Sequence, residues 1–297
     1  MSEATAEVSI PSLQRAPLER RALVSNFLTG LAWLVALLAA VPLFSVLYML
    51  IVRGGSRLNL EALTTLPPAG FEMGGGFGNA LVGTVVMVGI GAAIAVPVGI
   101  LAAIFLAELG SNSTLGNVAR FATKTLTGLP SILAGVLAYA LVVLVTGSYS
   151  APAGGLALSL LMVPTVILTA EEAIKMVPKI MKDAAYGLGC TRTQVILKVL
   201  LPTALPGIVT GVMLAVARAA GETAPLLFTA LSSSYWLYQD GHLALMQPTA
   251  SLAVLIYNFS GMPFDNQIEL AWAASLVLVL IVLIINVVSR FLGRPKI

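Results

Sequence analysis

The amino-acid sequence predicts an all-α, polytopic membrane protein with six transmembrane helices and one large charged cytoplasmic loop. Two observations support this prediction. Of the 297 residues, 58% are hydrophobic and 10% are charged, and the mean hydropathy is +0.98, whereas a soluble domain carries about 25% charged residues. Apolar runs also recur six times along the chain, most of them long enough to cross a hydrocarbon core.

The six apolar runs follow a polar tail, residues 1–27, and form one transmembrane domain, residues 28–297. The first run is too long for the apolar core of a signal peptide, so we expect a retained helix. In the third run, Pro130 and Ser131 either kink the span or open a half-helix toward an anion, and a kink is the commoner outcome. The expected spans are residues 28–52, 78–107, 126–146, 156–170, 204–230 and 271–291.

Lysine and arginine are distributed unevenly over the loops between these spans. If the N-terminus is cytoplasmic, 13 of the 16 basic residues lie in cytoplasmic segments, Arg53 and Arg57 lie outside, and Arg218 lies within a span. Because cytoplasmic loops retain basic residues, we expect both termini and the loop of residues 171–203 in the cytoplasm. The cytoplasmic residues are then Arg15, Arg20, Arg21, Arg120, Lys124, Lys175, Lys179, Lys182, Arg192, Lys198, Arg290, Arg294 and Lys296.

The loop of residues 171–203 has the pattern of two short helices joined by a tight turn. Pro178 suits the first turn of a helix, and Gly189 suits a chain reversal at a helix end. Apolar residues then recur at helical spacing until Pro202. Such helices need a partner to cover their apolar face, so the pattern predicts a docking element. A helix lying on the membrane surface is the alternative.

The sequence lacks the motifs of several other functions. No stretch matches G-x-x-x-x-G-K-S/T, so we expect no phosphate-loop site for ATP and magnesium on this chain. One histidine, His242, argues against a His-based metal site, and one cysteine, Cys190, excludes an internal disulfide. We therefore expect no catalytic residue, metal, cofactor or nucleic-acid partner for this chain, which is not an enzyme.

The fifth predicted span carries two opposite charges. Arg218 and Glu222 stand four residues apart near its middle, so on a continuous helix they share a face and can pair. A central arginine costs about 2.5–3.5 kcal/mol to insert, and such residues normally face the bundle interior or an aqueous cavity. From the residues alone, a salt bridge that locks helices and a charged pair on a transport pathway explain the pattern equally well.

The charged loop resembles the EAA loop of bacterial ABC-importer permeases, whose pattern is E-A-A, three residues, G, nine residues and I-x-L-P. Asp183 replaces the usual glutamate and keeps the charge on a shorter side chain. The matching residues are Asp183, Ala184, Ala185, Gly189, Val199, Leu201 and Pro202. Other stretches resemble the PstA-type permeases of bacterial phosphate ABC transporters: ARAAGETAPLL at 217–227, GLPSIL at 128–133, PTVILTAEEAIKMVP at 164–178 and LAVLIYNFS at 252–260.

This resemblance implies an inner-membrane permease subunit of an ATP-driven phosphate importer. Its expected partners are a second homologous permease, two ATPase subunits, a periplasmic phosphate-binding protein, phosphate and the lipid bilayer. The resemblance further implies that the loop couples to the ATPase through Asp183, Ala184, Ala185, Gly189, Leu201 and Pro202.

The resemblance also favours a transport role for the charged pair. A guanidinium binds oxyanions through two parallel hydrogen bonds, so Arg218 is the candidate for a transient anion contact and Glu222 for its counter-charge. Thr223 follows in the same signature and is the third candidate residue of the translocation pathway. The family often has an arginine three residues before the first glutamate of the pre-loop segment, where this chain has Leu168. Either Arg218 is the only anion contact that this permease subunit supplies, or the second permease supplies the missing positive charge.

Three other functions remain open. A permease for molybdate, sulfate or phosphonate would share the EAA loop, and competition in uptake assays would separate these substrates. A secondary transporter would need no ATPase, but the inverted repeats that usually mark one are not evident. A membrane scaffold that transports nothing would tolerate Arg218→Leu.

Overall fold

The computed structural model describes residues 20–111, 113–239 and 241–292. Most of these residues are helical, which confirms the all-α fold. Their strands form one hairpin, in which β1 (Tyr238–Gln239) pairs antiparallel with β2 (His242–Leu243). The chain divides into two units, Met1–Met49 and Leu50–Ile297. The division into a tail of 1–27 and a domain of 28–297 stays a prediction, and residues 1–19, with Arg15, and 293–297, with Arg294 and Lys296, lie outside the described residues.

Helix α1 (Arg20–Met49) is the described part of the first unit. It begins at Arg20 rather than near residue 28, so residues 20–27 are helical and not part of an irregular tail. Large apolar side chains such as Phe27, Trp33 and Phe44 are well exposed. A helix that is apolar on all sides is suited to a bilayer.

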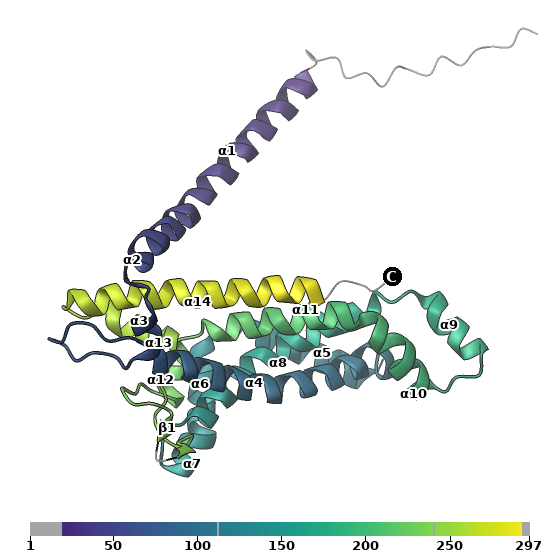
Figure 1. The fold of residues 1–297 in the computed structure, drawn as a ribbon. Helices are drawn as coiled ribbons and strands as arrows, with labels where there is room; N and C mark the ends of the chain where they lie inside the picture. The colour runs from purple at the N-terminus through teal and green to yellow at the C-terminus, as the bar shows by residue number, and fades with distance from the viewer. Residues whose placement is uncertain (1–19, 112, 240, 293–297) are drawn as a thin grey trace, which may run out of the picture. The chain divides into compact units, whose positions relative to one another are not determined.

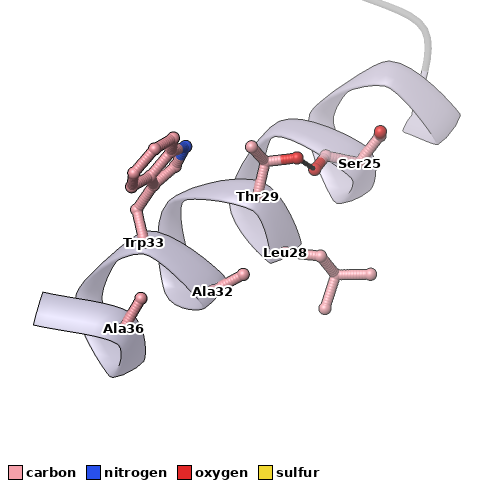
Figure 2. Close-up of a pocket in the computed structure, with 6 residues that line it drawn as sticks. All are labelled: Ser25, Leu28, Thr29, Ala32, Trp33 and Ala36. Carbon is pink, nitrogen blue, oxygen red and sulfur yellow. Dashed lines mark hydrogen bonds between the residues drawn. The ribbon is translucent and has the colours of Figure 1, made fainter. Parts of the chain in front are cut away.

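One face of α1 carries a shallow depression, shown in Figure 2, that is lined by Ser25, Leu28, Thr29, Ala32, Trp33 and Ala36. The Thr29 Oγ1 donates to the Ser25 carbonyl at 2.8 Å, so this hydroxyl is satisfied within the helix. All six lining residues come from the same helix. With no second wall, the depression does not enclose a ligand.

Within the described residues, five helical segments are long and apolar enough to cross a membrane, and a bent pair provides a sixth if it acts as one span. The pair consists of α5 (Thr114–Thr127) and the helical run Ser131–Thr146, which are bent by 104° at the break between them. That run contains α6 (Ser131–Ala138), η3 (Tyr139–Val143) and α7 (Leu144–Thr146). The five spans are Arg21–Arg57, Gly78–Leu109, Ala151–Lys175, Arg192–Ala220 and Asp265–Ser289.

Helix α8 (Ala151–Lys175) lies at the centre of the second unit, between α4 (Gly78–Ile104) and α11 (Leu201–Ala220) (Figure 1). Small residues allow the backbones to approach closely. A Cβ added to Gly155 of α8 would lie 2.4 Å from the Ile90 Cγ2 of α4. Membrane helices associate through close packing of this kind, because in lipid the hydrophobic effect does not favour their association.

Several predicted boundaries differ from the structure. The fourth span does not stop near residue 170, because α8 continues to Lys175 and buries Glu171. The fifth does not run to residue 230: it begins with α10 (Arg192–Val195) and η4 (Ile196–Leu200), continues as α11, and ends at Ala220. The last helix, α14 (Asp265–Leu292), starts before residue 271. Helix α12 (Ala224–Thr229) lies within the predicted fifth span but is separate from α11, and further short helices lie in or extend into the predicted loops: η1 (Leu50–Gly54), α2 (Gly55–Arg57), α3 (Leu60–Thr64), η2 (Phe105–Leu109), α9 (Lys179–Gly187) and α13 (Leu252–Ser260).

Candidate coupling and transport sites

The chain between α8 and α11 forms two short helices joined by a tight turn, as predicted, and we call residues 176–200 the coupling segment. Gly189 has φ +81°, in the left-handed region that glycine adopts without strain. The amide of Cys190 donates to the Ala185 carbonyl at 3.1 Å, and the amide of Gly189 donates to the Tyr186 carbonyl at 2.9 Å. These two bonds form a Schellman motif, which closes the end of α9.

The next helix, α10, begins with a reciprocal cap. The Thr191 side chain accepts from the Gln194 amide, and the Gln194 side chain accepts from the Thr191 amide at 2.8 Å. This capping box satisfies two amides that the start of a helix leaves unpaired. The turn between α9 and α10 is therefore closed on both sides by hydrogen bonds within the chain.

The coupling segment is fixed to the end of α4 by charged contacts. Lys182 of α9 forms an ion pair with the Glu108 carboxylate in η2, and the Arg192 guanidinium donates to the Glu108 carbonyl. Apolar packing adds to this attachment, since Ala185 and Val195 lie in a buried cluster with Ala103, Ala170, Ala173, Ile174, Val177, Leu200, Ala204 and Ile208.

The predicted coupling residues divide by exposure. Asp183, Ala184, Gly189 and Pro202 are exposed. Ala185 is only 7% exposed and Leu201 is partly buried, so both pack inside this chain. Large apolar side chains that the motif does not include point outward instead: Ile180 is 75% exposed and Leu188 is 86% exposed. Such an apolar surface on short polar-flanked helices is typical of a docking site.

The charged pair lies at a helix break rather than in the middle of a continuous helix, so that expectation was wrong. Arg218 is in the last turn of α11, while Glu222 follows the helix end. The Arg218 Nε still lies 3.7 Å from the Glu222 Oε1. The Arg218 side chain is 59% exposed and the Glu222 side chain 16% exposed, so this guanidinium can be reached from outside the chain.

Thr223 sits between the break and α12. It is partly buried, and its carbonyl accepts from the amides of Leu226 and Leu227 at 3.1 and 3.2 Å. Helix α12 packs against α6, where a Cβ added to Gly135 would lie 2.6 Å from the Pro225 Cα. Helix α12, which follows the break after α11, is thus in tight contact with α6, which follows the break at Pro130. At Pro130 the chain is broken rather than merely kinked, and a new helix starts at Ser131.

The sequence did not reveal a three-residue ion cluster around Glu171. This carboxylate is buried, and its Oε1 accepts from the Arg120 Nε at 2.9 Å and from the Lys175 Nζ at 2.5 Å. The Arg120 guanidinium also donates to the Leu106 carbonyl at 3.2 Å. The structure thus supplies a guanidinium to Glu171 from α5. Nothing in local spacing connects positions 120 and 171.

Among the described residues, no group of three or more His, Cys, Asp and Glu side chains is placed to hold a metal ion. The described residues instead present exposed apolar side chains on the coupling segment and an accessible guanidinium at a helix break.

Residues 95–294 match the family of binding-protein-dependent transport system inner membrane components. The chain belongs to this family. The matched region contains the coupling segment, the Glu171 cluster and Arg218. The expected class, a multi-pass permease component of an inner-membrane transport system rather than an enzyme or a cofactor-bearing protein, is confirmed.

Relatives match over almost the whole length. The chain is 38% identical to the phosphate transport system permease protein PstA of Haemophilus influenzae, over 92% of this chain and 94% of that protein. It is 38% identical to PstA of Yersinia pestis, over 92% and 88%, and 37% identical to a probable PstA of Methanocaldococcus jannaschii, over 86% and 88%. An inward-facing structure of the MetNI methionine ABC transporter is 20% identical, with a TM-score of 0.55 over 73% of this chain and 92% of that one, and therefore shares the fold.

Proposed function

We propose that this permease component imports phosphate, with Arg218 making a transient contact to the anion. The accessible Arg218 guanidinium, in the last turn of a membrane-spanning helix, is the observation that carries the proposal. A phosphate that leaves water needs its hydration replaced, and guanidinium offers paired hydrogen bonds to oxyanions. The relatives named as phosphate permeases support phosphate as the anion.

Glu222 is the counter-charge for Arg218 in the absence of substrate. At 3.7 Å the pair is an ion contact without a close hydrogen bond. A loose contact costs less to break than a tight bidentate one, so an anion can displace the carboxylate and leave again. Weak binding of this kind is needed for turnover. Thr223 follows Glu222 at the same break and is the third residue of the proposed pathway.

The proposed complex contains a second homologous permease, two ATPase subunits and a periplasmic phosphate-binding protein. An arginine exposed to lipid is unfavourable, so the exposed Arg218 favours a second permease or an aqueous pathway beside it. In this complex both termini and the coupling segment are cytoplasmic, as the distribution of basic residues indicates.

The ATPase contact in this proposal is the exposed part of the coupling segment. Asp183, Ala184 and Gly189 lie on its surface beside Ile180 and Leu188. Ala185 and Leu201 support the segment by packing against the rest of this chain, and Pro202 lies at its edge. ATP and magnesium are then bound by the ATPase, and this chain contributes no group to hydrolysis.

Uptake of phosphate in proteoliposomes tests the proposal. The complex with Arg218→Gln is compared with wild type and with Lys124→Gln, which removes a positive charge from an exposed position on α5. We expect Arg218→Gln to lose uptake while the ATPase still co-purifies, and Lys124→Gln to keep it. Normal uptake by Arg218→Gln would refute the anion contact. Competition by molybdate, sulfate and phosphonate shows whether another oxyanion is preferred.

A further inference from the structure

We propose that Arg120 is a positioning residue that connects the coupling segment to the bent pair α5–α6, so that movement of the coupling segment reaches the break at residues 128–130. The inference rests on the proposed function, in which an ATPase moves this chain through the coupling segment. It adds a route for that movement, from η2 through Arg120 to α5.

The contacts of Arg120 join three separate elements. Its Nε donates to Glu171 of α8 at 2.9 Å, and its second terminal nitrogen donates to the Leu106 carbonyl of η2 at 3.2 Å. A third bond, to Asn117 at 3.2 Å, stays within α5. The planar guanidinium holds these partners at fixed angles, which a lysine ammonium does not.

The burial of Glu171 makes its partner at Arg120 energetically important. Glu171 is 3% exposed, and a buried carboxylate that loses a cationic partner is strongly destabilised. Lys175 also pairs with Glu171, but both residues lie on α8, so this pair links nothing beyond its own helix. Among the described residues that pair with Glu171, Arg120 alone comes from a different helix.

The other end of the route is the same short element that anchors the coupling segment. Arg120 binds η2 through the Leu106 carbonyl, and Lys182 and Arg192 bind η2 at Glu108. A displacement of α9 or α10 that keeps these contacts must therefore move η2. Arg120 then transmits the displacement to α5, because its bonds fix α5 to both η2 and α8.

From α5 the route continues to the break between α11 and α12, where Arg218 and Glu222 lie. Helix α5 ends at Thr127, directly before the 104° bend, and α6 follows it. Gly135 of α6 lies against Pro225 of α12, with no room for a Cβ. Helix α12 in turn follows the break that holds Glu222. A rigid shift of α5 thus changes the bend and the packing beside the proposed anion contact.

The experiment measures whether the bend responds to nucleotide. In a Cys190→Ser background, Leu129→Cys places a single thiol in the break, where Leu129 is exposed. The labelling rate with a water-soluble maleimide is measured for the assembled complex, with and without ATP and vanadate. The labelling assay needs no phosphate. If the proposed substrate is wrong, uptake fails but the labelling response remains; if the proposed route is wrong, the labelling response itself differs from the expected one.

We expect the labelling rate to change with nucleotide by about fivefold or more in the parent complex, as for typical coupled sites. With Arg120→Gln the change should fall below about twofold, while binding of the ATPase is kept. Lys175→Gln is the matched control: it also removes a cation from Glu171 but breaks no link between helices, so it should keep the parent response. A purely stabilising role of the charge pair predicts equal losses in the two variants.

A charge-exchange double variant tests whether the loss of response in Arg120→Gln comes from the lost ion pair or from a folding defect. Arg120→Glu combined with Glu171→Arg restores the ion pair between α5 and α8 and should recover part of the response. Arg120→Lys keeps the charge without the forked geometry and should give an intermediate response. A full response in Arg120→Gln, equal losses in Arg120→Gln and Lys175→Gln, or a thiol that labels at one rate in every state of the parent complex would overturn the proposal.

Discussion

The packing of α8 against α11 leads to a specific prediction for Gly211→Ala. A Cβ at this position would lie 2.1 Å from the Thr169 Oγ1 and 2.5 Å from the Thr169 Cβ. A change of rotamer can move the hydroxyl, but it cannot move the Cβ. The two helices must therefore separate by about 1 Å to restore ordinary contact, and overpacking of this kind costs about 1–3 kcal/mol. At roughly 2–4 °C per kcal/mol, the melting temperature should fall by about 2–12 °C.

The assay is thermal unfolding of the purified protein, followed by a thiol-reactive fluorophore at Cys190, which is the one cysteine in the sequence and is partly buried. Gly89→Ala is the control, because a Cβ there meets nothing within 4 Å. It should leave the melting temperature unchanged or raise it slightly. Thr169→Gly combined with Gly211→Ala transfers the missing Cβ to the other helix and should recover most of the loss. Melting of Gly211→Ala at the wild-type temperature, or no recovery in the double variant, would refute the packing argument.

Three further substitutions test the coupling segment and the bent pair. Gly189→Ala should cost about 1–2 kcal/mol of stability because of its positive φ, whereas Gly187→Ala, also in open space, should cost nothing measurable; equal melting temperatures would contradict this. Thr191→Ala removes the cap of α10 and should cost about 1 kcal/mol, seen as faster hydrogen exchange in its first turn, and unchanged exchange would argue against the capping box. Gly135→Ala should lower the melting temperature because its Cβ would meet the Pro225 Cα at 2.6 Å; a variant as stable as wild type would show that α6 and α12 are not in tight contact.

Local rules were sufficient to predict the turn of the coupling segment. Glycine at position 189 follows a run of helix formers, and a chain reversal after a helix commonly uses a left-handed residue, for which glycine is preferred. The structure confirms the turn through the φ of +81°. The same holds for the contact between Arg218 and Glu222, since residues four apart remain close even where the helix ends.

The break in the fifth span had a local signal that was ambiguous. Pro225 has no amide hydrogen to donate to the Gly221 carbonyl, so an α-helix cannot continue through it with all bonds formed. Yet Pro97, Pro164 and Pro206 all lie inside helices of this structure. Membrane helices accept proline where neighbouring groups satisfy the free carbonyl. Which proline ends a helix is therefore decided by packing that the sequence does not display.

The Glu171 cluster could not be predicted from one sequence. Glu171 opens the charged stretch predicted to be a cytoplasmic loop, and its spacing from Lys175 is that of an ordinary surface pair on a helix. The residue that makes the site different is Arg120, which is distant in the sequence and approaches only because α5 folds back beside α8. Burial of the carboxylate follows from this tertiary contact.

The closed turn of the coupling segment has a thermodynamic consequence for association. Its Schellman motif and capping box are formed by this chain alone, so a protein that docks there does not pay to order the turn. Binding to such a preformed apolar surface should show a negative heat-capacity change from burial of side chains such as Ile180 and Leu188, without the large unfavourable entropy of coupled folding. The attachment can then be strong enough to transmit force and still dissociate as one rigid piece.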